Sequence, residues 1–111
     1  MFQKNLNMGY LLDFYGELLS DRKRSVMDMY YNEDFSLAEI AEQLGISRQG
    51  ARDIIKKSEE ELGFYEEKLG LASKLHDVEK QSDELCTLAK ASDIPSELRD
   101  KIIALSALIR Q

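Results

Sequence analysis

The segment SLAEIAEQLGISRQGARDIIKK, residues 36–57, predicts two helices joined by a tight turn. Ser36 and Glu39 have the S-x-x-E spacing of a capping box, in which a hydroxyl and a carboxylate satisfy the free amides at a helix start. Gly45 can take the left-handed conformation that ends a helix, and Ser47 is suited to cap the next helix. The spacing therefore predicts a helix-turn-helix motif with Gly45 in its turn.

Small and apolar residues of this segment fit the same motif. Ala41 is small enough to let the two helices approach each other, and Ile46 is expected to turn inward after the glycine. Six residues would fill the angle between the helices: Ile40, Leu44, Ile46, Ala51, Ile54 and Ile55. The alternative is an ordinary pair of core helices joined by a glycine turn, which needs only the apolar spacing.

The outward face of the second helix carries the residues that could contact nucleic acid. A step of about 100° per residue places Ala51, Ile54 and Ile55 on the buried side. The predicted nucleic-acid-binding residues are Ser47, Arg48, Gln49, Arg52, Asp53, Lys56 and Lys57. Arginine can pair with guanine, glutamine with adenine, lysine with phosphate, and the amides behind Ser47 with a phosphate oxygen. The alternative is a polar face that meets only solvent.

Asp53 stands apart from its neighbours on this face because its charge is negative. Its carboxylate would repel phosphates unless it accepts a hydrogen bond from cytosine or pairs with Lys57 one turn later. Asp53 therefore favours weak or selective binding.

The chain has 111 residues and a formal net charge of −6, but its charges are segregated. Residues 36–57 hold four basic and three acidic side chains, whereas residues 58–70 hold five glutamates and one lysine. We expect these carboxylates to be solvated. The run Arg22-Lys23-Arg24 could flank a bound nucleic-acid backbone. The chain lacks the broad basic surface that a tight nonspecific binder displays.

The composition predicts an all-α fold, because beside its isoleucines the chain has only Val26, Val78 and Thr87 among the β-branched residues that strands favour. Apolar residues at helical spacing predict a first helix, which contains Met8, Leu11, Leu12, Tyr15, Leu18 and Leu19. A short second helix is predicted after Ser20 and contains Val26, Met27 and Tyr30. Residues 1–70 are expected to form the helix-turn-helix domain.

Residues 71–111 are expected to form a helical C-terminal extension. Leu71, Leu75, Val78, Ser82, Leu85 and Ala89 predict a long helix that packs lengthwise against another helix. Pro95 would lie near the first turn of a C-terminal helix, whose apolar face is formed by Leu98, Ile102, Leu105 and Ile109. These two helices could form a hairpin that folds back on the N-terminal core, or one that serves as the seam of a homodimer.

The sequence gives little support for catalysis. His76 and Cys86 are the only residues of their kinds, and they would lie on different sides of a continuous helix. The six glycines are scattered, so no phosphate-binding glycine loop is formed. We expect no enzymatic activity, cofactor or metal. A single cysteine suits a reducing compartment, so we expect a cytoplasmic protein, and the N-terminal apolar run is too short to span a membrane.

Three runs of sequence together resemble the YlxM family, small bacterial proteins associated with the signal recognition particle. They are LLDFYGELLSDRKR at residues 11–24, YYNEDFSLAEIAEQLGISRQG at residues 30–50 and YEEKLGL at residues 65–71. The resemblance implies an all-helical protein with a helix-turn-helix similar to region 4 of sigma factors. It also implies a non-enzymatic accessory or regulator of that protein-targeting pathway, which would contact the particle's RNA or its GTPase. Ala51 and Arg52 depart from the apolar and aromatic residues expected after SRQG.

Two functions therefore use the same predicted surface. The first is an accessory protein of the targeting particle, and the second is a DNA-binding transcriptional regulator unrelated to that particle. The major groove of B-form DNA admits an α-helix, whereas the deep, narrow groove of A-form RNA does not, which favours DNA. A more distant alternative is a module that docks only to protein, and an enzyme is the most distant.

Overall fold

The computed structural model describes residues 6–110, and every regular element in that range is helical. The prediction of an all-α fold is confirmed. The chain divides into two compact units, Met1–Gly70 and Leu71–Gln111. The first unit contains α1 (Leu6–Tyr15), the 3-10 turn η1 (Gly16–Leu18), α2 (Asp21–Tyr31), α3 (Leu37–Leu44) and α4 (Arg48–Leu69), and the second contains α5 (Leu71–Ala91) and α6 (Ser96–Ile109).

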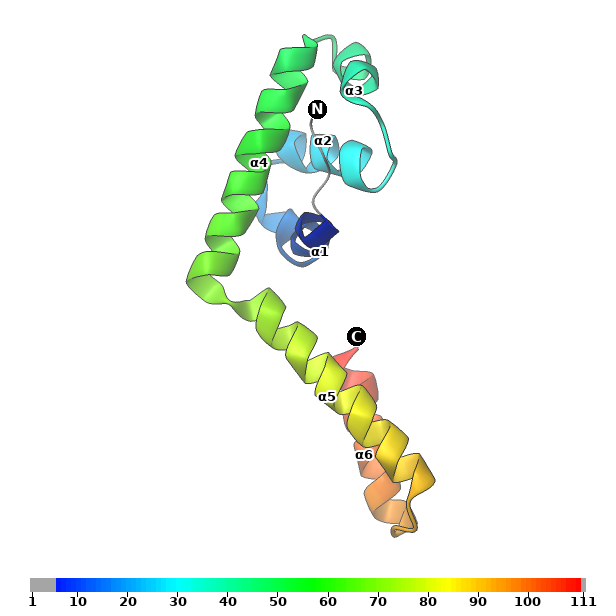
Figure 1. Ribbon diagram of the computed structural model, residues 1–111. Helices are drawn as coiled ribbons and strands as arrows, with labels where there is room; N and C mark the ends of the chain where they lie inside the picture. Colours follow the sequence, from blue (N-terminus) through cyan, green and yellow to red (C-terminus); the bar gives the residue numbers. More distant parts are fainter. Residues whose placement is uncertain (1–5, 111) are drawn as a thin grey trace. The chain divides into compact units, whose positions relative to one another are not determined.

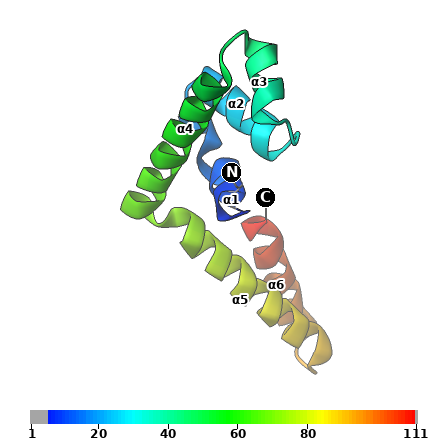
Figure 2. The ribbon, with the colours of Figure 1, turned by 45° about the horizontal axis from the view of Figure 1, so that its top comes forward.

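The first unit is built around α4, which has 22 residues and contacts α1, α2 and α3 (Figures 1 and 2). The largest side chains that are fully buried come from three of these helices: Val26, Met27, Ile40, Ile55 and Leu62. Packing of these apolar side chains supplies most of the stability that fixes the direction of α4.

Side-chain caps define where α2 and α3 begin. Ser20 Oγ accepts a hydrogen bond from the backbone N–H of Lys23 at 3.3 Å. Ser36 Oγ accepts from the N–H of Glu39 at 3.1 Å, and Glu39 Oε1 accepts from the N–H of Ser36 at 3.0 Å. The hydrogen bond from the Ser36 backbone, helped by the Ser36 side chain, lowers the pKa of Glu39. The predicted capping box is confirmed.

The end of the first helix differs from the prediction. The α-helix α1 ends at Tyr15, and the chain continues as the 3-10 turn η1 over Gly16–Leu18. A 3-10 turn has three residues per turn rather than 3.6, which rotates the following side chains away from the apolar face. Leu18 is therefore 57% exposed, and its assignment to the buried face was wrong, whereas Leu12, Tyr15 and Leu19 are buried as predicted.

The second unit is a helical hairpin in which α5 and α6 pack side by side (Figure 1). Arg99 closes the connection between them, because its Nε donates to the carbonyl of Ala89 at 3.2 Å and its Nη2 donates to the carbonyl of Ser92 at 2.9 Å. Arg110 and Asp83 form an ion pair between the two helices.

None of the helices between residues 6 and 110 is both long and apolar enough to cross a membrane.

Candidate nucleic-acid interface

The turn between α3 and α4 has the geometry that the sequence predicts. Gly45 lies in the left-handed region, with φ +67° and ψ 36°. The N–H of Ile46 donates to the carbonyl of Ala41 at 3.0 Å, and this bond across six residues is the mark of a Schellman ending. A side chain with a Cβ atom would be strained at Gly45 although nothing lies within 4 Å of that position, so the constraint comes from the backbone alone.

The start of α4 is fixed by Ser47, whose Oγ accepts a hydrogen bond from the N–H of Gly50 at 2.9 Å. Ala41 and Ala51 are both buried, and Ile46 is half-buried. Small residues in these places allow α3 and α4 to pack closely next to the turn. The helix-turn-helix is therefore present in the structure as it was predicted from the sequence.

The outward side of α4 displays every residue of the predicted contact surface. The exposed residues are Ser47, Arg48, Gln49, Arg52, Asp53, Lys56 and Lys57. On the inward side, Ala51 and Ile55 are buried and Ile54 is half-buried. We call the seven exposed residues the recognition face, and their contact with nucleic acid stays a prediction.

Asp53 has a partner on its own helix. The Nε2 atom of Gln49 donates to Oδ1 of Asp53 at 2.9 Å. Lys57 was one predicted partner of this carboxylate, but in the structure its partner is Gln49, one turn earlier. In this contact the amide oxygen of Gln49 is left to accept a hydrogen bond.

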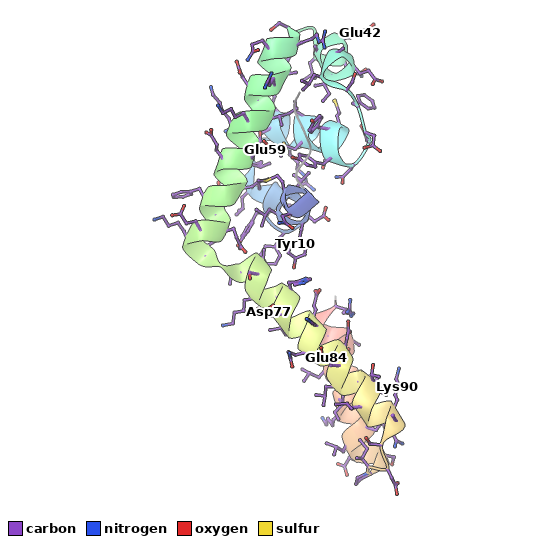
Figure 3. The ribbon with its side chains drawn as sticks, in the orientation of Figure 1. Tyr10, Glu42, Glu59, Asp77, Glu84 and Lys90 are labelled. Atoms are coloured by element: carbon purple, nitrogen blue, oxygen red, sulfur yellow. The ribbon has the colours of Figure 1, made fainter. Side chains whose placement is uncertain are left out.

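The glutamates in the second half of α4 are less solvated than expected. Glu59 accepts a hydrogen bond from the hydroxyl of Tyr31 on α2, and it lies midway along α4 in Figure 3. Glu66 accepts from the hydroxyl of Tyr15 at the end of α1 at 2.7 Å. These carboxylates therefore attach α4 to the two helices that precede the motif, and the expectation that all of them face water was wrong.

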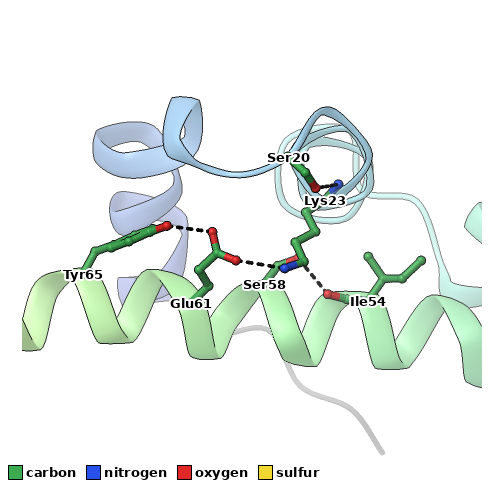
Figure 4. Close-up of polar contacts among 6 residues, drawn as sticks. All are labelled: Ser20, Lys23, Ile54, Ser58, Glu61 and Tyr65. Carbon is green, nitrogen blue, oxygen red and sulfur yellow. Dashed lines mark hydrogen bonds and ion pairs between the residues drawn. The ribbon is translucent and has the colours of Figure 1, made fainter.

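Lys23 and Glu61 form a second connection between α2 and α4 (Figure 4). The Nζ atom of Lys23 lies 2.9 Å from Oε1 of Glu61, and the hydroxyl of Tyr65 donates to Oε2 of the same carboxylate at 2.9 Å. The hydrogen bond from Lys23 lowers the pKa of Glu61, and the hydrogen bond to Glu61 raises the pKa of Tyr65. Nearby, the buried hydroxyl of Ser58 donates to the carbonyl of Ile54 at 2.7 Å.

This ion pair changes the set of residues that can flank a nucleic acid. Lys23 belongs to the predicted basic run, but its ammonium group is turned toward Glu61. Arg22 and Arg24 are exposed on the same helix. We therefore count these two arginines, and not Lys23, with the recognition face when phosphate contacts are considered.

The outer surface of α4 changes its charge along the helix. Arg48, Arg52 and Lys56 are exposed in its first half, whereas Glu60 and Glu67 are exposed in its second half. A phosphate backbone would be attracted by the first half and repelled by the second. The charge pattern therefore favours the first turns of α4 over its second half as a surface for phosphates. Within residues 6–110, no group of three or more metal-ligating side chains is gathered at this face or elsewhere.

Comparison with known proteins identifies one family. A sequence model of the family UPF0122, described as "Putative helix-turn-helix protein, YlxM / p13 like", matches residues 2–102. A UPF0122 protein of Halalkalibacterium halodurans is 44% identical over 108 residues, which cover 97% of this chain and 96% of that relative. A UPF0122 protein of Listeria innocua is 43% identical over 103 residues, covering 92% and 94%. A UPF0122 protein of Caldanaerobacter subterraneus subsp. tengcongensis is 50% identical over 80 residues, covering 72% and 68%.

Proposed function

Because the chain belongs to the UPF0122 family of YlxM/p13-like helix-turn-helix proteins, we propose that it is a non-enzymatic regulatory protein that binds nucleic acid through the recognition face. One observation carries the proposal. Arg48, Gln49 and Arg52 are exposed on the first turns of α4, directly after a turn whose Gly45 has the left-handed conformation. This is where a helix-turn-helix presents its base-contacting side chains.

The chemistry of the recognition face supports binding of moderate strength. Either arginine can donate two hydrogen bonds to guanine, and Lys56 and Lys57 can approach phosphates. Asp53 and the exposed glutamates further along α4 oppose a nonspecific grip on the backbone. The arrangement therefore favours selection of a site over general attraction to nucleic acid.

The pathway follows from the resemblance to YlxM proteins. We propose that the protein acts in the cytoplasm as an accessory of the signal recognition particle, through that particle's RNA or its GTPase. The second candidate is a transcriptional regulator that binds duplex DNA. It is supported by the projecting first turns of α4, because a B-form major groove accepts a helix and the deep groove of A-form RNA does not.

A charge-matched pair of variants tests the recognition face. Arg48→Ala/Arg52→Ala removes two positive charges from it, and Lys80→Ala/Lys90→Ala removes two exposed positive charges from α5. We expect the first variant to bind at least about tenfold more weakly, because each lost contact costs roughly 1–3 kcal/mol. The second should bind like the wild type. Filter binding to duplex DNA and to the particle's RNA measures both, and also decides between the two candidate targets.

Equal weakening of binding in both variants would show that only net charge matters and would remove the recognition face from the function. Unchanged binding in both would have the same consequence. The wild-type protein could instead bind neither nucleic acid but retain the particle's GTPase on an affinity column. That result would make the helix-turn-helix a protein-docking module.

A further inference from the structure

The α5–α6 hairpin leaves most of its apolar side chains uncovered. Its only buried residues are Ala72 and Ala89, and no residue of α6 is buried. In contrast, Leu88 is 64% exposed and Leu105 is 52% exposed. A unit of about 40 residues is near the lower size limit for stability without disulfides, a metal or oligomerisation.

Four of the exposed apolar residues, Val78, Leu85, Leu88 and Leu105, lie on one side of the hairpin, whereas Leu71, Leu98, Ile103 and Leu108 do not line the groove there. A groove of about 530 Å³ runs between the helices there. Its apolar lining consists of Val78, Leu85 and Leu88 from α5 and Ile102, Leu105 and Ile109 from α6. The ion pair of Asp83 and Arg110 does not line this groove, and a helical step of about 100° per residue puts Asp83 on another flank of α5 from Leu85. The hairpin therefore has an apolar face around this groove, with Ile103 and Leu108 exposed outside it.

We propose that this apolar face is covered by the same face of a second copy of the chain, so that two α5–α6 hairpins form a four-helix bundle. Two hairpins with identical apolar faces can pair about a two-fold axis, each supplying the ridge that fills the other's groove. A second copy is present wherever the chain itself is made. It can therefore cover the face permanently, as such a poorly buried hairpin requires.

The size of the face is close to the lower limit for a stable dimer. Helices of 21 and 14 residues are about 30 Å and 20 Å long at 1.5 Å per residue, and two packed helices are about 20 Å wide. The face thus projects an area on the order of 500 Å², and its accessible area is larger because the side chains stand out from it. Stable interfaces bury roughly 600–1,000 Å² on each partner.

The polar residues of the groove suit the same arrangement. Asp77, Gln81 and Glu84 line it on α5 and are exposed. A polar rim around an apolar centre is the usual composition of an interface. The pairing goes beyond the proposed nucleic-acid binding and does not depend on it.

Sedimentation equilibrium of the full chain without nucleic acid tests the pairing. We expect the wild type to be a dimer at about 10 μM, and Leu88→Glu to raise the dimer dissociation constant at least about 100-fold. The matched control is Thr87→Glu, which adds the same charge at the neighbouring exposed position outside the groove and should leave the dimer intact. Far-ultraviolet circular dichroism should show equal helix content in all three proteins.

Two results would overturn the proposal. A wild type that remains monomeric to about 200 μM would show that no second copy covers the face, and the chain's own first unit or another protein would then be its occupant. A Leu88→Glu dimer as tight as the wild type would place the seam elsewhere. If Leu88→Glu loses helix content, the milder Leu88→Gln must still weaken the dimer about tenfold. A monomeric wild type that still binds nucleic acid would leave the proposed function intact.

Discussion

The turn glycine Gly45 allows a sharp test of the helix-turn-helix, because a second glycine on α4 serves as its control. Gly45 has φ +67°, and a Cβ atom there would meet nothing within 4 Å. A Cβ atom at Gly63, inside α4, would also meet nothing within 4 Å, but Gly63 has ordinary helical torsions. Substitution by alanine therefore adds one methyl group into open space at both sites. Only the backbone conformation differs.

The two substitutions should change stability in opposite directions. An L-residue in the left-handed region costs about 1–2 kcal/mol, so Gly45→Ala should lower the free energy of unfolding by that amount. Alanine inside a helix is favoured over glycine by about 0.5–1 kcal/mol, so Gly63→Ala should raise it. The two variants should thus differ by roughly 1.5–3 kcal/mol. Gly45→Val should cost more than Gly45→Ala, because β-branched residues tolerate positive φ poorly.

Urea unfolding of the full chain, followed by circular dichroism, measures these differences, and filter binding measures the effect on function. Gly45→Ala should weaken nucleic-acid binding as well as stability, whereas Gly63→Ala should leave binding unchanged. If Gly45→Ala proved as stable as Gly63→Ala, the left-handed turn would not be the conformation in solution, and the geometry assigned to the motif would be incorrect.

Four further predictions concern charged groups. Lys23→Met should lower the free energy of unfolding by about 0.5–1 kcal/mol, because its ion pair with Glu61 is only partly exposed. The control variant Arg22→Met should leave stability unchanged and weaken nucleic-acid binding. The hydrogen bond from Lys23 lowers the pKa of Glu61, so the ionised Glu61 stabilises the fold fully above its unfolded-state pKa, and this stabilisation is lost as pH falls through its folded-state pKa. The Lys23→Met variant should lack this pH-dependent loss of stability in acid unfolding. Identical acid-unfolding profiles of variant and wild type would contradict the pairing. Asp53→Asn should retain the hydrogen bond from Gln49 but remove a negative charge. Nonspecific DNA binding at low salt should therefore tighten about three- to tenfold. Weaker binding would mean that the carboxylate itself contacts a base. Finally, the slope of log binding constant against log salt should be about −3 to −5 for a monomer on duplex DNA and about double for a dimer, and a slope of zero would exclude phosphate contacts.

The parts of the fold that could be predicted from the sequence are those encoded by neighbouring residues. The capping box joins Ser36 to a residue three positions later, and the turn depends on Gly45 alone. Exposure of the recognition face follows from helical periodicity, once the start of α4 at Ser47 is known. Each of these signals lies within a few residues in the chain, so no knowledge of the tertiary structure was needed.

The connections that the sequence did not reveal join residues far apart in the chain. Lys23 and Glu61 are 38 positions apart, and Tyr15 and Glu66 are 51 positions apart. Lys23 was predicted to flank a nucleic-acid backbone together with its basic run, and Glu61 was expected to be solvated together with its acidic run. The available signal was the helical register of α4, because Glu61 and Tyr65 are one turn apart and point to the same side. Pairing them with α2 still required the packing of the helices.

The continuity of α4 has a consequence for how the protein could adapt to a ligand. The helix that carries Arg48 and Arg52 also carries Glu59, Glu61 and Glu66, and hydrogen bonds hold these glutamates to α1 and α2. Rotation of α4 about its axis would break all of these bonds together. The direction in which the recognition face points is therefore fixed before a ligand binds, and only the side chains of this face can adjust to the ligand. Because α4 is already helical in this structure, binding through the recognition face should cost little backbone conformational entropy, and the heat-capacity change of association should be that of rigid surfaces meeting.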